Sequence, residues 1–200
     1  MASPSNPNAA ADPVSELVGS MPSAYPQIFD RRDIAEHAVI LAGRRQSRAH
    51  AAEWRQLPGG TMIVCLVADD VPGLLSLVSA AFVSHHLDVT SAQIFCRTTD
   101  SGGREAVDFF WLRRARSSRL SRQIDPSEIA SVSRMVDELI SEEGQARLSA
   151  LKELERMAPE LPVRPRVFYD TRALRRGDVI LNVVTPDRPG LPASPSRADL

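Results

Sequence analysis

The chain has 200 residues, of which 43% are hydrophobic, and a formal net charge of −1 at pH 7. This length accommodates one domain, or one domain and part of another, and the near-zero charge excludes a global attraction to nucleic acid or to an acidic membrane surface. No run reaches the roughly 18 apolar residues of a membrane span, and the N-terminus has neither the basic start nor the apolar core of a signal peptide. We therefore expect a cytoplasmic protein with no nucleic-acid or membrane partner.

The N-terminal part of the chain predicts a tail, a helix and a short strand. Residues 1–20 are rich in Pro, Ser, Asn and Ala, and we expect them to be disordered because they offer too little apolar surface to offset ordering. After them, Asp30 is a suitable helix N-cap, and apolar residues at helical spacing continue to Gly43, which can end the helix. A short strand is predicted over 49–56.

The middle of the chain alternates strand and helix patterns. The run 61–68 is apolar and rich in β-branched residues, as in a strand buried on both faces, and an amphipathic helix follows it. Further patterns predict strands at 87–98, 106–114 and 164–171, and a helix that begins with Asp125, Pro126 and Glu128. The order β-α-β-β-α-β is that of a ferredoxin-like α+β fold, whose helices cover one face of the sheet.

The third of these strands carries large apolar side chains on both faces. Side chains alternate along a strand, so Phe109 and Trp111 point opposite to Phe110 and Leu112. If the two helices cover one face, then the N-terminal helix, a second domain or a partner chain must cover the other. The alternative is a few exposed aromatic side chains.

The turn between strand 61–68 and the helix after it reads Asp70-Val-Pro-Gly-Leu-Leu75. The first turn of a helix presents unpaired N–H groups and a positive dipole, to which a carboxylate can bind. Pro72 fixes φ there, and Gly73 lets a ligand or another backbone approach closely. Asp70 can cap the helix or accept a hydrogen bond from an ammonium group. The residues alone leave both a plain helix cap and an amino-acid site open.

This stretch and the strands after it resemble the ACT domain, a small regulatory module that commonly binds amino acids. The motif residues are Asp70, Pro72, Gly73, Leu74 and Leu75 in the turn, Ala92 and Ile94 in the next strand, and Ala106, Asp108 and Phe110 in the third strand. Val71 departs from the pattern, which usually has Arg at that position. The upstream stretch 21–41 resembles the segment before the paired ACT domains of the PII uridylyltransferase/uridylyl-removing enzyme family.

The turn occurs a second time near the C-terminus, because 62–74 and 179–191 align without a gap. Asp187, Arg188, Pro189 and Gly190 repeat the turn, with Arg restored. Pro192 and Pro195 then exclude a helix, so the second ACT copy is expected to be truncated, by loss of sequence or a frameshift. We predict that strand 178–184 adds to an edge of the first sheet or crosses to a partner chain.

The resemblance implies an amino-acid ligand, with glutamine as the candidate, and no cofactor. It places the ligand-binding residues at Asp70, Pro72, Gly73, Leu74, Leu75 and Ile94, in a site that a second chain completes. The expected partners are therefore this ligand and a second copy, or a separate catalytic chain. Five arginines at 113–122 lack interleaved aromatic residues; a solvated loop is the favoured interpretation over contact with an acidic partner or nucleic acid.

Catalytic and metal-binding patterns are missing from the chain. Cys65 and Cys96 are far apart, and the histidines form no metal-ligand pattern. The paired aspartates of nucleotidyl transfer and the His-Asp cluster of the hydrolytic half of the resembled enzymes have no counterpart. We therefore expect a regulatory module and not an enzyme; the alternatives are a docking or dimerisation module without a ligand, and a chain with uridylyltransferase activity of its own.

These expectations divide the chain into five parts. They are a disordered segment at 1–20, a helix and connecting strand at 21–60, an ACT domain at 61–171, the start of a truncated second repeat at 178–191, and a disordered tail at 192–200.

Overall fold

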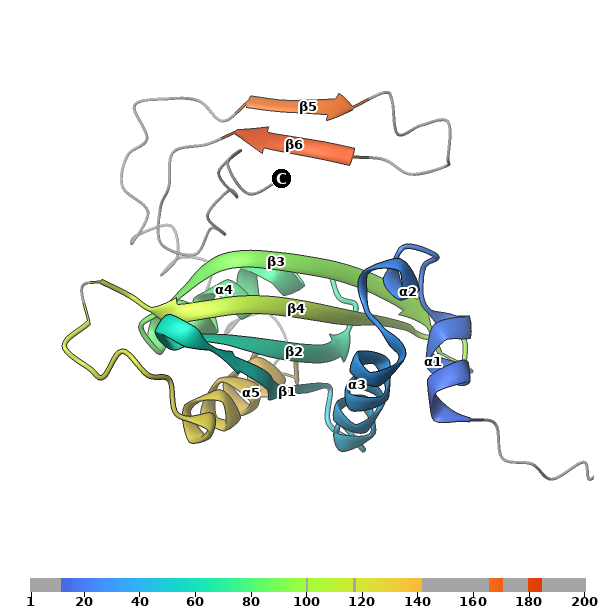
Figure 1. Ribbon diagram of the computed structural model, residues 1–200, viewed down its shortest axis with the longest axis horizontal. Helices are drawn as coiled ribbons and strands as arrows, with labels where there is room; N and C mark the ends of the chain where they lie inside the picture. Colours follow the sequence, from blue (N-terminus) through green and yellow to red (C-terminus); the bar gives the residue numbers. More distant parts are fainter. Residues whose placement is uncertain (1–11, 100, 117, 142–165, 171–179, 185–200) are drawn as a thin grey trace, which may run out of the picture.

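The computed structural model describes residues 12–99, 101–116, 118–141, 166–170 and 180–184. It is an α+β fold built on a four-stranded antiparallel sheet, with helices on both of its faces (Figure 1). The helices are α1 (Pro13–Ser20), α2 (Tyr25–Ile28), α3 (Arg31–Gly43), α4 (Leu74–Ser84) and α5 (Pro126–Ser141). The strands are β1 (Ala49–Leu57), β2 (Thr61–Asp69), β3 (Leu87–Thr98), β4 (Arg104–Arg114), β5 (Arg166–Asp170) and β6 (Ile180–Val184).

Most of the predicted elements form where the sequence places them. Asp30 caps α3 by accepting a hydrogen bond from the Asp33 N–H at 2.8 Å. At the start of α5 a reciprocal cap forms, in which Asp125 accepts from the Ser127 N–H and Glu128 accepts from the Asp125 N–H. The predicted continuation of this helix beyond Ser141 lies outside the described residues.

The sheet has the order β1-β2-β4-β3, and this corrects the predicted source of its fourth strand. The sequence pattern assigned that strand to 164–171, but β1 occupies the position beside β2. A short turn at Pro58–Gly60 joins β1 to β2, and Gly59 and Gly60 both have positive φ. A strand so near in sequence closes a small loop, whereas a strand about 100 residues downstream loses more chain entropy on pairing.

The last two strands pair with each other and form a separate two-stranded antiparallel sheet, in which Phe168 is opposite Asn182. The prediction that 178–184 adds to the edge of the first sheet is therefore wrong for the chain as described. Its partner is β5, which is the nearest strand in sequence.

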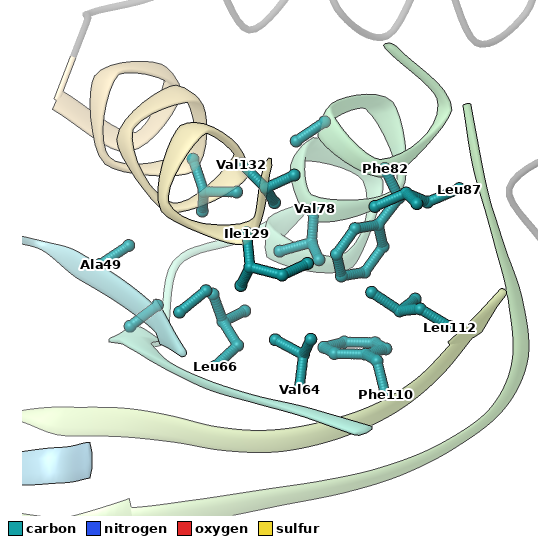
Figure 2. Close-up of a cluster of buried hydrophobic side chains, with 14 of the residues drawn as sticks. Ala49, Val64, Leu66, Val78, Phe82, Leu87, Phe110, Leu112, Ile129 and Val132 are labelled. Atoms are coloured by element: carbon teal, nitrogen blue, oxygen red, sulfur yellow. The ribbon is translucent and has the colours of Figure 1, made fainter. Parts of the chain in front are cut away.

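The larger core lies between the sheet and helices α4 and α5. Figure 2 shows Val64, Leu66, Phe110 and Leu112 of the sheet pointing toward residues of the two helices, among them Val78 and Ile129. The helical spacing predicted for both helices produces this packing, because their apolar stripes face the same side of the sheet. In the sheet, the even-numbered residues of β2 and β4 form this face.

The second core lies on the opposite face of the sheet, the face to which Phe109 and Trp111 point, and it shows what covers these side chains. Phe109 is fully buried and Trp111 packs against the same cluster. Helices α1, α2 and α3 supply the covering side chains, which include Leu17, Met21, Tyr25, Phe29 and Ile34. Of the three candidates for the cover, the N-terminal helix is confirmed, together with two short helices that were not predicted.

Helix α1 contradicts the expectation that all of 1–20 is disordered. Asp12 caps it by accepting from the Val14 N–H at 3.3 Å, and Pro13 occupies its first position. Leu17 is 3% exposed because it packs on the second core. The composition argument failed here because the few apolar residues of α1, namely Val14, Leu17 and Val18, are all placed to pack on the second core. Residues 1–11 lie outside the described part.

The two edges of the four-stranded sheet differ. Along β1, side chains of α5 accept hydrogen bonds from the strand's backbone: Asp137 accepts from the Arg48 and Ala49 N–H groups at 2.6 and 2.9 Å, and Ser133 accepts from the Ala51 N–H at 2.8 Å. At the other edge, β3 pairs with β4 on one side, and within the described part of the chain no strand pairs with its other side. No helix among the described residues is long and apolar enough to cross a membrane.

Candidate ligand site at the N-terminus of helix α4

The Pro-Gly pair before α4 forms a tight turn that needs its glycine. The Leu74 N–H donates to the Val71 carbonyl at 3.1 Å, and Gly73, between them, has φ +81° and ψ +8°. These angles are those of the third residue of a type II turn, in which Pro is favoured before Gly. Gly73 is also the N-cap of α4. The turn therefore redirects the chain from β2 into α4 within four residues, and Pro72 precedes the helix instead of lying inside it.

Replacing Gly73 with Ala is expected to lower the free energy of unfolding by about 1–2 kcal/mol, because a side chain penalises positive φ. Sterics are not the cause, since an added Cβ would meet no atom within 4 Å. Gly19→Ala is the matched control: it too has open space, but its φ is not positive and it lies within α1. Urea unfolding that gave equal stabilities for Gly73→Ala and Gly19→Ala would contradict this account.

Asp70 does not cap α4. Its Oδ2 atom accepts a hydrogen bond from the Arg104 guanidinium at 2.8 Å and from the Cys96 thiol at 3.2 Å, and the Arg104 guanidinium also donates to Cys96 Sγ at 3.3 Å. These three residues come from the ends of β2, β4 and β3, which meet at one end of the sheet (Figure 1). The helix-cap interpretation of Asp70 is therefore wrong.

Two amide groups at the start of α4 remain available. The Ser76 and Leu77 N–H groups donate to the Gly73 carbonyl, and the Leu74 N–H is used in the turn. Among the described residues, no backbone or side-chain acceptor takes the N–H of Gly73 or Leu75. Together with the positive end of the helix dipole, they suit a carboxylate.

Two of the predicted site residues have exposed apolar side chains. Leu75 is the second residue of α4, and Ile94 is on β3, directly opposite Asp108 in the register and on the same face of the sheet. Each is 48% exposed, unlike the rest of the apolar residues in the turn and the facing strands. They are available to contact the apolar part of a ligand or a second protein surface.

Asp108 is a buried acid on the same sheet face as Asp70 and Arg104. It is 1% exposed; its Oδ1 accepts a long hydrogen bond, 3.3 Å, from the Phe95 N–H, and its Oδ2 has no hydrogen-bond partner among the described residues. Burial raises the pKa of this carboxyl to about 7, and the negative charge of Asp70 adds to the increase. An acid in this state gains or loses its proton near neutral pH.

A second set of charges lies on the opposite face of the same strand ends. Arg44 of α3 pairs with both Asp69 and Glu105, and Arg97 donates to Glu105 at 2.5 Å. Arg97 also donates to Ser20 of α1 at 3.2 Å. Each of these strand residues is the sequence neighbour of one in the Asp70 cluster, so the two sets are back to back across the sheet.

Of the predicted site residues, those of the first turn are adjacent in the chain, and one of them has its side chain in the core. Asp70, Pro72, Gly73, Leu74 and Leu75 are contiguous, and Ile94 lies on the strand edge on the same face; Leu74, 5% exposed, belongs to the core and can offer only its backbone. The residues of the second turn, Asp187, Arg188, Pro189 and Gly190, lie outside the described residues.

Sequence reasoning missed the roles of Arg104, Cys96 and Asp108. The alternation of β4 provided a signal, because Asp108 is an acid at a position where the pattern requires a buried apolar residue. No sequence pattern predicts Arg104 as the partner of Asp70, because Arg104 is more than 30 residues away in the chain and follows a separate turn. Within the described residues, no group of three or more His, Cys, Asp or Glu side chains could hold a metal ion.

In comparisons with known proteins, no family model, no curated protein and no solved structure matched this chain.

Proposed function

We propose that this chain is a regulatory module of the ACT type that binds a free α-amino acid, glutamine in the first instance, at the turn before α4. The observation that carries the proposal is the pairing of two chemistries at one place. Unoccupied N–H groups of Gly73 and Leu75 suit the carboxylate, and the acidic side chain of Asp70 suits the ammonium group. The type II turn and the motif residues in β3 and β4 support the ACT assignment.

Binding requires Asp70 to exchange partners. In the free chain the Arg104 guanidinium neutralises Asp70, but Arg104 has 70% of its side chain exposed, and an ion pair of this kind is worth less than about 1 kcal/mol. A ligand ammonium can therefore take the place of Arg104, and the released guanidinium is free to contact the ligand's carboxylate. The proposal assigns no catalytic step to the chain.

The open β3 edge favours a second candidate function, docking or dimerisation without a ligand. Strand addition at such an edge is a common mode of association, and Ile94, which is exposed on β3, would lie beside the added strand. Docking can also accompany ligand binding, because a second copy or a separate catalytic chain at this edge could complete the ligand site; the second candidate differs in that no ligand binds. A ligand measurement distinguishes between them.

Calorimetry with glutamine is the test, with thermal shift over the twenty amino acids as a screen. We expect saturable heat for the wild-type chain. Asp70→Asn should bind at least tenfold more weakly, because it removes the negative charge that faces the ligand's ammonium group; a tenfold change corresponds to about 1.4 kcal/mol. Asp88→Asn is the matched control: Asp88 also pairs with an arginine of β4, and it is 30% exposed against 29% for Asp70. It should bind as the wild type does.

Two results separate the candidate functions. A folded chain that gives no heat and no thermal shift with any of the amino acids up to millimolar concentration would refute the sensing function. If that chain still formed a dimer in sedimentation, and the dimer was lost in Ile94→Arg, then docking alone would remain.

A further inference from the structure

Asp108 is a buried acid, and one of its two carboxyl oxygens, Oδ2, has no hydrogen-bond partner among the described residues. A buried carboxyl oxygen without a partner destabilises the fold, and such atoms are rare in folded proteins. Its Oδ2 lies on the sheet face that α4 covers, between Leu66 of β2 and Ile94 of β3, which are opposite it in the register. Neither neighbour can offer a hydrogen bond through its side chain.

The groups around Asp108 explain why it is uncharged part of the time. From β2, Asp70 opposes its ionisation, and the thiol of Cys65 on the other face offers no compensating positive charge. From β3 the backbone of Phe95 donates the one hydrogen bond that favours the carboxylate, and Cys96 lies farther along the same face. On its own strand, Arg104 is already engaged by Asp70 and Cys96. Helix α4 contributes no charged side chain.

The neighbour of Asp108 on β3 is partly open to solvent. Ile94, directly opposite Asp108 in the register, is half exposed on a strand with no described neighbour on its outer side. For a ligand at this edge of the sheet to reach Oδ2, the Ile94 side chain must move.

We propose that Asp108 is the second carboxylate of the ligand site: its free Oδ2 accepts a hydrogen bond from the cationic group of the bound amino acid, and binding displaces the proton of Asp108 to solvent. This inference rests on the proposed amino-acid function and adds to it a residue and a proton-linked affinity. Asp70 at the surface and Asp108 beneath it then share the positive charge of the ligand, and their mutual repulsion falls when it binds.

The sign of the pH effect follows from the ionisation of Asp108. The ligand binds the carboxylate and not the neutral acid, so affinity increases as the pH rises through 7, the value to which burial raises the pKa of this group. For a single group of this kind, we expect about tenfold tighter binding at pH 8 than at pH 6. Near one proton should be released per ligand at pH 6, and almost none at pH 8.

The experiment is calorimetry of the full chain with glutamine at pH 6, 7 and 8, in buffers of low and high ionisation enthalpy. The difference between the buffers gives the number of protons released. Asp108→Asn should bind with an affinity that does not change with pH and without proton release. Asp70→Asn should lose affinity but keep a pH dependence, displaced to lower pH because the charge of Asp70 no longer raises the pKa of Asp108. The Asn variant also corrects for titration of glutamine itself.

The outcomes distinguish this inference from the function on which it depends. Binding with the same dissociation constant at pH 6 and 8, or with equal proton release in wild type and Asp108→Asn, would refute the role of Asp108 and leave amino-acid sensing intact. Absence of binding at all three pH values would refute both.

Discussion

Phe109→Ala is expected to lower the free energy of unfolding by about 3–5 kcal/mol, the range for removing a fully buried aromatic side chain. Phe109 is 0% exposed and lies at the centre of the second core. Its ring centroid is 4.7 Å from that of Phe29 and 4.4 Å from that of His37, so it contacts both α2–α3 and the sheet. The variant therefore removes one of the ring contacts that join the N-terminal helices to the sheet.

Phe110→Ala is the matched control, because Phe110 is the neighbour on β4 and is buried in the other core. Both variants should lower the urea midpoint. Hydrogen exchange should differ: in Phe109→Ala the amides of α1 and α3 should exchange faster than those of α4 and α5, and in Phe110→Ala the order should reverse. Equal exchange across all helices in both variants would show that the two cores do not unfold separately.

The second large effect is a pH dependence of the free energy of unfolding, which two opposing contributions cancel in the wild-type chain. His37 is fully buried, and its Nδ1 is 2.7 Å from the Tyr25 hydroxyl, while its Nε2 has no partner among the described residues. Burial lowers the pKa of His37 from 6.5 to about 4. Between these values the unfolded chain holds more protons, so acidification lowers the free energy of unfolding through this residue.

Asp108 acts in the opposite direction over the same range. Burial raises its pKa from 3.8 to about 7, so between these values the folded chain holds the extra proton and acidification stabilises it. At about 1.4 kcal/mol per pKa unit, the limiting contributions are roughly 3–4 kcal/mol for His37 and roughly 4–5 kcal/mol for Asp108. Between pH 6.5 and 4.5 the two contributions largely cancel, and the wild-type stability should change little.

Single variants should reveal the two contributions. Asp108→Asn leaves His37 alone, and its free energy of unfolding should fall by about 2–3 kcal/mol between pH 6.5 and 4.5; His37→Gln leaves Asp108 alone, and its stability should rise over the same interval by a similar amount. Urea unfolding at four pH values measures this. Parallel curves for the two variants would contradict the assignment, and the exposed carboxylates, common to all chains, cancel in the comparison.

The sequence predicted local structure well and long-range arrangement less well. Strand 87–98 and the caps of α3 and α5 follow from alternation and from side chains that bond to nearby N–H groups, which are local properties. The source of the sheet's edge strand was wrong because two stretches had strand character, and which one pairs with β2 depends on chain entropy and on α5. The residue pattern of a single stretch cannot show which of two candidate strands pairs with β2.

The site divides in the same way. The turn from Asp70 to Leu74 is readable because the Pro-Gly pair fixes its geometry. Arg104 could not be foreseen as the partner of Asp70, because the pairing arises from the register of β2 with β4 and from a turn that positions the end of β4. The burial of Asp108 depends on the covering helix and on both neighbouring strands, so its altered ionisation emerges only from the assembled sheet.

The unequal edges of the sheet set an upper limit on how many copies can join through it. Side chains of Ser133 and Asp137 accept hydrogen bonds from the N–H groups of Arg48, Ala49 and Ala51, so a strand added along this part of β1 would have to displace α5. A sheet that can grow from one side only has a valence of one: two copies joined through β3 present two closed edges and stop. Continuous growth into a fibre needs two open edges, and within the described residues α5 removes one of them.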